Sequence, residues 1–309
     1  MKWFFGLYPG DKVKIKGSYY YISDFFPEIN ILFNIYYILK KNKLYKEIEN
    51  YSFDKIFSIK NNKVMADSGS FIYYRKNIKP PRIDTLIRRY RLINPDYAVH
   101  NDIPISFLKK NIKSSTLLKK NLTNAKEFLM RSKNENYIPI GVAQGFNKHT
   151  YLKQIKELYY LGFEVIGIGG IAKKSNSLIK EYLEFVKDFV KKNKIKIHIF
   201  GVGRFDPLKN IPIYSFDNTS PVQDAHRDSI GKVSYYYWIT NKKSIKKLSL
   251  FDINNGLIEF NEKCCCEMCE IFQDEIFQTG KAPRNRARSY HNAYIYQKCL
   301  DLNVSQHNI

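Results

Sequence analysis

The chain has 309 residues, and its 51 lysines and arginines exceed its 29 aspartates and glutamates by 22. Hydrophobic residues make up 44% of the sequence and aromatic residues 15%, which supports a sizeable core and excludes an intrinsically disordered chain. The length predicts one large domain, with room for a small appendage. The positive charge favours an acidic partner such as a nucleic acid, because lysines and arginines bind phosphates by releasing counterions.

The apolar runs are too short for a membrane-spanning helix. The best candidate, residues 29–39, is interrupted by Asn34 and falls below the ~18–20 apolar residues that a span requires. The first residues run quickly into Pro9, Gly10 and Asp11, a pattern unlike the apolar core of a signal peptide. We therefore expect a soluble cytoplasmic protein that makes no contact with membranes.

Short apolar runs alternate with longer amphipathic segments along the chain. The strand-like runs are residues 63–66, 97–100, 138–143, 164–168, 195–202 and 211–216. The helix-like segments between them are 82–92, 116–131, 150–161 and 177–192, and the last of these has apolar residues at helical spacing. Apolar strands followed by helices predict parallel β–α units. Six such units fit a (β/α)8 barrel of the TIM type better than an open sheet, and we expect it to fill residues 1–250, leaving 251–309 as a smaller module.

Four of the five cysteines lie within six residues, too close together for ordinary structural disulfides between them. Cys264, Cys266 and Cys269, followed by His291, supply three thiolates and one imidazole, a full tetrahedral ligand set for structural zinc. Cys265 is an alternative ligand, and a cluster of buried thiols without metal is the other interpretation. The sequence therefore predicts that the C-terminal module binds Zn²⁺.

A basic stretch lies between the last of these cysteines and His291. It contains Arg284, Arg286 and Arg288, and such side chains position a phosphate backbone without reading its sequence. The alternative interpretation is a solvated loop. We predict a nucleic-acid contact at these three arginines.

Polar residues and glycines follow the predicted strands, where a barrel gathers them at one mouth. Three of them are carboxylates, Asp67, Asp102 and Asp217. The other candidates for this mouth are Ser68, Phe71, Gln144, Gly145, Gly169, Gly170 and Phe200. A helix cap for Asp102 and ordinary core packing for the two phenylalanines are the alternative interpretations.

Paired carboxylates without a nucleotide-binding loop indicate chemistry at a glycosidic bond. No glycine-rich phosphate loop follows any predicted strand. One carboxylate can attack the anomeric carbon while the other handles the proton of the leaving and entering groups. Phe71 and Phe200 can enclose a planar base, and Asp102 and Gln144 can read its polar edge.

These motifs, in their order along the chain, resemble those of the tRNA-guanine transglycosylases. Residues 67–71 (Asp-Ser-Gly-Ser-Phe) are similar to the Asp-Ser-Gly-Gly-Phe/Tyr element of that family, and Phe216-Asp217 is similar to its nucleophile segment. The turns at 144–145, 169–170 and 200–203 resemble its base-binding turns, and the cysteine–histidine set resembles its zinc module. The resemblance runs from about residue 60 to about residue 300 and implies a barrel enzyme that exchanges a nucleic-acid base for a 7-deazaguanine.

The resemblance also implies roles for single residues. Asp217 would attack C1′ and form a covalent glycosyl-enzyme, and Asp67 would act as general acid and base. The base would be recognised by Asp102, Gln144 and the Gly169-Gly170 backbone, between the rings of Phe71 and Phe200. The target nucleotide must leave the stack to reach such a pocket, so base flipping or a single-stranded substrate is required.

Departures from the tRNA enzymes favour DNA as the substrate. Gln223 and His226 stand near positions where those enzymes carry arginines that grip the anticodon loop, and Arg227 is a candidate replacement. Ser175 stands where bacterial enzymes place a glutamate that pairs with an aminomethyl base, so we expect a neutral substituent, as in 7-cyano-7-deazaguanine (preQ0). The sequence thus favours the DpdA-type branch, which modifies DNA, over a tRNA enzyme.

Other classes and partners stay open from the sequence. A transglycosylase-like subunit without activity is one alternative, and a zinc hydrolase on a barrel is another. The hydrolase needs ligands at strand ends, where only His100 is suitably placed, and we interpret His198 as a hydrogen-bonded core residue inside a strand. Helper proteins of a DNA-modification system and a homodimer are further partners that the family resemblance allows.

Overall fold

The computed structural model describes residues 1–38, 43–105, 114–203, 206–208, 211–226, 234–239, 244–255, 264–278 and 282–304. The chain divides into two compact units. The barrel unit consists of Lys2–Tyr8 and Asn30–Asn218, and the second unit consists of Met1, Pro9–Ile29 and Thr219–Ile309.

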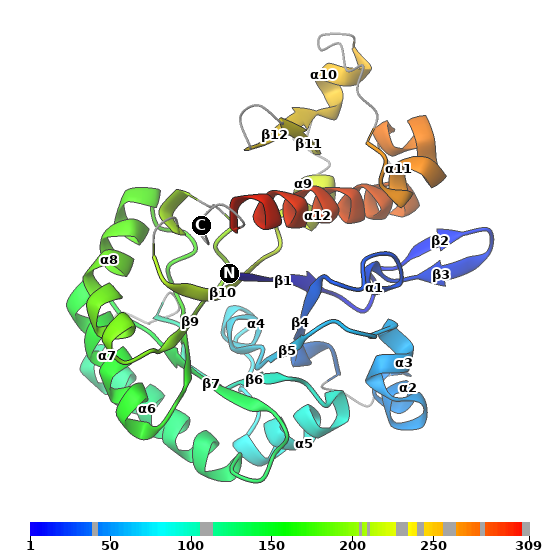
Figure 1. Ribbon diagram of the computed structural model, residues 1–309. Coiled ribbons are helices and arrows are strands. Elements are labelled where there is room, and N and C mark those ends of the chain that lie inside the picture. Colours follow the sequence, from blue (N-terminus) through cyan, green and yellow to red (C-terminus); the bar gives the residue numbers. More distant parts are fainter. Residues whose placement is uncertain are drawn as a thin grey trace. The chain divides into compact units, whose positions relative to one another are not determined.

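The barrel unit contains a closed ring of eight parallel strands, which confirms the predicted TIM-barrel fold (Figure 1). In chain order these are β1 (Lys2–Leu7), β4 (Asn30–Asn34), β5 (Val64–Asp67), β6 (Tyr97–Val99), β7 (Ile138–Ala143), β8 (Val165–Ile168), β9 (Lys196–Ile199) and β10 (Ile213–Asn218). Each strand pairs with the next in this order, and β10 pairs with β1 to close the ring. The C-terminal ends of all eight strands therefore meet at one end of the barrel.

Helices follow the barrel strands, and the longer ones cover the outside of the ring. They are η1 (Ile35–Ile38), α2 (Lys43–Tyr51), α3 (Phe53–Phe57), α4 (Ser70–Arg75), α5 (Ile83–Ile93), α6 (Ser114–Arg131), α7 (Lys148–Leu161), α8 (Asn176–Lys192) and η3 (Asp206–Leu208). In Figure 1, α5 to α8 surround the strands, whereas the short α4 is drawn inside the outline of the ring. The helix α8 begins at Ser175, whose Oγ accepts a hydrogen bond from the N–H of Leu178 at 3.3 Å.

Apolar side chains fill the inside of the barrel. The buried cluster consists of Phe4, Leu32, Met65, Tyr97, Val99, Ile140, Val142 and Val165, with Phe200 and Tyr214 packed against it. Neighbouring strands hold these residues in register, for example Leu32 beside Met65. The next inward-facing position on β4 and β5 pairs Asn34 with Asp67, so the interior changes from apolar to polar at the strand ends.

The second unit is built around the long helix α12 (Ala282–Val304). Its other elements are β2 (Val13–Ile15), β3 (Ser18–Tyr20), α1 (Ile22–Phe25), α9 (Ser220–His226), β11 (Ser234–Ile239), β12 (Ser244–Ser249), α10 (Leu250–Asn254), α11 (Glu267–Phe272) and η4 (Gln273–Phe277). The Asn292 amide accepts the N–H of Tyr236 at 2.8 Å and donates to the carbonyl of Pro221 at 3.3 Å. Because α9 and the β11–β12 hairpin are thus tied to α12, this division differs from the boundary expected at residue 250.

Across the described ranges, no helix combines the length and the apolar character needed to cross a bilayer.

Candidate active site and metal centre

The structure brings the three predicted carboxylates together at the C-terminal end of the barrel. Asp67 ends β5, Asp102 follows β6, and Asp217 lies near the end of β10. Burial, together with the negative charges of the other two carboxylates, raises the pKa of Asp67 to about 7. Burial also raises the pKa of Asp102 to about 6. The cluster therefore contains groups that can exchange a proton near neutral pH.

Asp67 is held by the neighbouring strand and by the turn that follows it. The amide nitrogen of Asn34, its partner in register, donates to the Asp67 carboxylate, and the Asn34 oxygen accepts the N–H of Tyr36 at 3.0 Å. In the turn, Gly69 has a φ of +79°, and a Cβ there would lie 2.8 Å from the Asn34 oxygen. Both the backbone conformation and the space therefore require glycine at this position.

Asp102 belongs to a second polar group with Gln144 and the glycine pair. The Gln144 amide nitrogen donates to the Asp102 carboxylate, and both side chains are buried. A Cβ on Gly169 would lie 2.4 Å from that nitrogen, so glycine leaves room for the amide. The Tyr151 hydroxyl donates to the Gly169 carbonyl at 2.8 Å and fixes the turn. The structure thus places Asp102, Gln144, Gly169 and the adjacent Gly170 side by side, as expected.

Asp217 is held by β9 and by the turn after it. Its Oδ1 accepts the N–H of Gly201 at 3.0 Å and lies 3.2 Å from Nε2 of His198. The other ring nitrogen of His198, Nδ1, lies 2.9 Å from the hydroxyl oxygen of Ser215. Ser215 is paired in register with His198 and faces the same side of β10 as Asp217, two residues further on.

The contact of His198 with the site was not predicted from the sequence. His198 is fully buried, as expected of a core residue, but its partner is the candidate nucleophile Asp217. Side chains alternate along a strand, so His198 and Phe200 point to the same side of the chain. This alternation was the signal that could have identified the contact of His198 with the site.

The two predicted base-stacking aromatics have different surroundings. The Phe200 ring packs edge-on against the His198 ring, with centroids 4.4 Å apart, and a Cβ on Gly167 would lie 2.3 Å from it. Phe71, on α4, is 45% exposed, and the Arg75 guanidinium lies 5.8 Å from its ring centre. Phe71 therefore offers an open aromatic face, and Phe200 a partly enclosed one.

Two predicted site residues have mainly structural contacts. Ser68 is buried, and its hydroxyl lies 3.0 Å from that of Ser70, whose side chain in turn hydrogen-bonds to Asp102. Gly145 packs against the Tyr151 ring, where a Cβ would lie 2.7 Å from ring carbons. Both residues thus support the neighbouring carboxylate and turn from within the protein.

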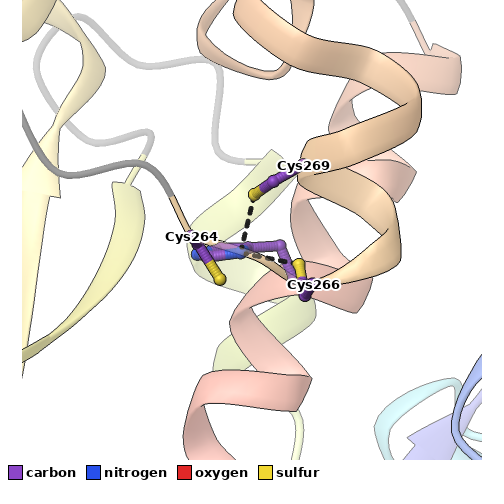
Figure 2. A group of neighbouring side chains, drawn as sticks. Cys264, Cys266 and Cys269 are labelled. Atoms are coloured by element: carbon purple, nitrogen blue, oxygen red, sulfur yellow. Dashed lines mark hydrogen bonds between the residues drawn. The ribbon is translucent and has the colours of Figure 1, made fainter.

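The predicted metal ligands converge in the second unit. One ligand atom from each of Cys264, Cys266, Cys269 and His291 lies within 4.8 Å of the others, and Figure 2 shows the three thiols grouped around one point. Cys266 is the N-cap of α11, Cys269 lies on its first turn, and His291 is on α12. The fourth clustered cysteine, Cys265, is exposed and lies outside this group.

The chemistry of these four groups fits a cation. His291 Nε2 lies 2.7 Å from the carbonyl oxygen of Tyr236 and so carries the proton, which leaves Nδ1 facing the sulfurs of Cys266 and Cys269 at 3.3 and 3.2 Å. Hydrogen bonds between the thiols lower the pKa of Cys264 and raise that of Cys266, so they share protons that a metal ion would replace. The cluster can therefore hold a metal ion. Among the described residues, no second group of metal-binding side chains occurs at the strand ends.

The structure conflicts with the predicted phosphate contact at one of the three arginines before His291, Arg288. These residues lie in α12 rather than in a loop, and Arg288 is fully buried, with its guanidinium donating to the carbonyls of Ala225 and Ile276. Arg284 pairs with Glu275 at 3.2 Å, and Arg286 donates to the carbonyl of Lys12 at 3.0 Å. Arg288 is thus unavailable to a phosphate, because it is committed to backbone carbonyls. Arg227, the remaining predicted contact, lies outside the described residues.

The fold and the site define a TIM-barrel protein with a carboxylate cluster at its strand ends. No protein-family model matches the chain. The chain is similar to a curated protein of Salmonella montevideo named DNA-guanine transglycosylase, with 28% identity over 209 residues. The match covers 64% of this chain and 50% of the relative, so the chain spans about half the length of the curated relative. This similarity supports the transglycosylase superfamily that the motifs of the chain resemble.

Proposed function

We propose that this protein is a base-exchange transglycosylase that replaces guanine in DNA with a 7-deazaguanine. The observation that carries the proposal is the pair of carboxylates Asp67 and Asp217, which share one end of the barrel but have different partners. Two carboxylates in different environments are suited to different tasks in glycosidic chemistry. The similarity to a protein named DNA-guanine transglycosylase supports the same chemistry and favours DNA over tRNA.

In this proposal Asp217 is the nucleophile. Its Oδ1 is oriented by His198 and Gly201, and Oδ2 attacks C1′ of the target deoxyribose. The new C1′–O bond forms as the C1′–N9 bond to guanine breaks, and the departing base takes a proton. The product is a covalent glycosyl-enzyme.

Asp67 is the general acid and base. Its pKa of about 7 allows it to be protonated when guanine leaves and to take the N9 proton when the 7-deazaguanine attacks. The second attack breaks the bond to Asp217 and restores the free carboxylate. Two successive displacements at C1′ retain the β-configuration of the nucleoside.

The polar group around Asp102 is proposed to bind the base. Asp102, Gln144 and the Gly169-Gly170 backbone present donors and acceptors to its edge, and Phe71 and Phe200 stack on its faces. Ser175 supports a neutral 7-substituent such as a nitrile, because its hydroxyl caps α8 and no carboxylate stands there for an ammonium. We propose 7-cyano-7-deazaguanine as the incoming base.

The metal ion is proposed to be zinc in a structural role. Three thiolates and one imidazole are the ligands of closed tetrahedral zinc sites. A bound ion would link the first turn of α11 to α12. None of the steps above passes through the metal.

The test is base exchange by purified protein. DNA and tRNA are incubated separately with protein and 7-cyano-7-deazaguanine, and their nucleosides are identified by mass spectrometry. The variant is Asp217→Ala, and the matched control is Asp188→Ala, which changes an exposed aspartate on α8. A deazaguanine deoxynucleoside with wild type and D188A, but not with D217A, supports the proposal. Modification confined to tRNA, or none in either nucleic acid, contradicts it.

A further inference from the structure

The segment that leaves the candidate active site after Asp67 is strongly basic. It contains Arg75 at the end of α4, then Lys76, Lys79 and Arg82 before α5, and all four side chains are exposed. No aspartate or glutamate occurs between Asp67 and Asp84. The segment 75–82 therefore concentrates positive charge and contains no acidic residue, and Asp84, two residues further on, pairs with Arg131.

These four cations also have no acidic partner in space within the described part of the chain. Nearby arginines of the same unit differ: Arg91 pairs with Glu135 at 2.6 Å, and Arg131 pairs with Asp84 at 2.5 Å. Carboxylates thus neutralise Arg91 and Arg131, whereas the segment 75–82 is left positive.

Contacts tie this segment to the carboxylate site at both of its ends. At one end, the Lys76 ammonium donates to the Tyr36 hydroxyl at 2.9 Å, and Tyr36 follows Asn34, which holds Asp67. At the other end, the Asn101 amide donates to the Pro81 carbonyl at 3.4 Å, and Asn101 precedes Asp102. The segment therefore crosses the active-site end of the barrel.

We propose that Arg75, Lys76, Lys79 and Arg82 form a track that binds the phosphates of the strand carrying the target nucleotide. The inference rests on the proposed function and adds the surface by which the nucleic acid is held. Phe71, exposed beside Arg75, makes a nucleic acid a better fit than an acidic peptide, because bases stack on open aromatic rings. Contacts of this kind position the strand and carry no sequence preference.

The track replaces the contact predicted at Arg288. A buried guanidinium bound to carbonyls cannot release counterions, whereas exposed and unpaired side chains can. Each phosphate contact on single-stranded DNA contributes about 0.7 to the slope of log affinity against log salt. Loss of two contacts should thus lower the steepness of that slope by ~1.4.

The experiment measures binding of a fluorescent single-stranded oligonucleotide by the full chain at several salt concentrations. The variant is Lys79→Gln/Arg82→Gln, because neither side chain makes a hydrogen bond or ion pair within the described part of the chain, and both are exposed. The control is Lys191→Gln/Lys192→Gln, an exposed pair at the C-terminal end of α8, on the opposite end of the barrel. Each variant loses two positive charges, so the two variants differ only in where on the barrel the charges are removed.

We expect the track variant to bind about tenfold more weakly near 0.1 M salt, with a slope reduced by ~1.4, and the control to stay close to wild type. Equal affinity and equal salt dependence of the two variants would overturn the proposed track. Base exchange, measured in parallel, separates this result from the proposed function. If wild type exchanges bases and both variants bind alike, the track fails alone; if the track variant binds weakly but wild type exchanges nothing, the proposed function fails alone.

Discussion

Nε2 of His198 lies 3.2 Å from Oδ1 of Asp217, in the buried interior of the barrel unit. An ionised carboxylate only accepts hydrogen bonds, so Nε2 must be the donor. In a neutral imidazole Nδ1 is then an acceptor, which the Ser215 hydroxyl satisfies at 2.9 Å. Ser215 thus fixes the tautomer, and His198 orients the carboxylate.

The first prediction concerns this orientation. His198→Phe removes the donor but keeps a buried ring, and we expect the rate of glycosyl-enzyme formation to fall about 10- to 100-fold while KM changes little. His198→Gln places an amide N–H near the position of Nε2, and we expect it to recover most of the rate. Ser215→Ala should have a smaller effect, about 2- to 10-fold, because the tautomer is no longer fixed.

Single-turnover kinetics with thermal unfolding of each variant provide the measurement. If the glutamine and phenylalanine variants are equally slow at equal stability, His198 fills space and does not position Asp217.

The second prediction follows from the raised pKa of Asp67. Departure of guanine needs a protonated Asp67, so adduct formation should decrease as the pH rises through about 7. Discharge of the adduct by the incoming base needs the carboxylate, so that step should increase over the same range. The two half-reactions can be timed separately by withholding the incoming base. If the rates of both half-reactions changed in the same direction with pH, Asp67 could not be both the general acid and the general base.

The third prediction concerns stability. The pKa of Asp67 rises from 3.8 to about 7 on folding, so its contribution is fully present below pH ~4 and is lost as the pH rises through 7. Asp67→Asn removes this loss. The unfolding free energy of the variant relative to wild type should therefore grow from pH 5 to pH 8, by about 2–3 kcal/mol. Urea unfolding at the two pH values tests this, with Asp188→Asn as the exposed control. A difference independent of pH would mean that Asp67 is not buried as described.

The fourth prediction concerns the metal. Elemental analysis should find about one zinc per chain, and Cys266→Ser should lose it and destabilise the second unit, since the ion links α11 to α12. Cys265→Ser is the matched control and should keep the metal, because Cys265 is exposed and outside the cluster. Equal metal loss in the two variants would show that Cys265 is a ligand in solution.

Much of the barrel was predictable because its strands and helices differ in period and length. Six of the eight strands were expected, and only β1 and β4 were missed. The strand β4 lies inside the apolar run 29–39, which resumes directly after Asn34 in η1, so a single asparagine was the only mark of the strand's end. The strand β1 contains Gly6 and is followed along the chain by β2 and β3, so no helix directly after it marks a β–α unit.

The grouping of the carboxylates was also predictable, because parallel strands bring their ends to one edge of the barrel. The contact between His198 and Asp217 was not, since it depends on the register of β9 and β10, which shifts between Ile213 and Ser215. The burial of Arg288 was missed for a different reason. The run of arginines was predicted to contact nucleic acid because arginines are usually exposed, although position 288 lies in the part of α12, residues 287–293, whose side chains are all buried.

The central claim is that Asp217 becomes covalently attached to the target sugar. The most direct measurement is peptide mass spectrometry of protein that has been incubated with guanine-containing DNA without an incoming base, quenched in acid and digested. We expect a sugar-linked adduct on the peptide that contains Asp217, formed in wild type and absent in Asp217→Asn. An adduct on Asp67, or rapid base exchange by the Asp217→Asn protein, would contradict it.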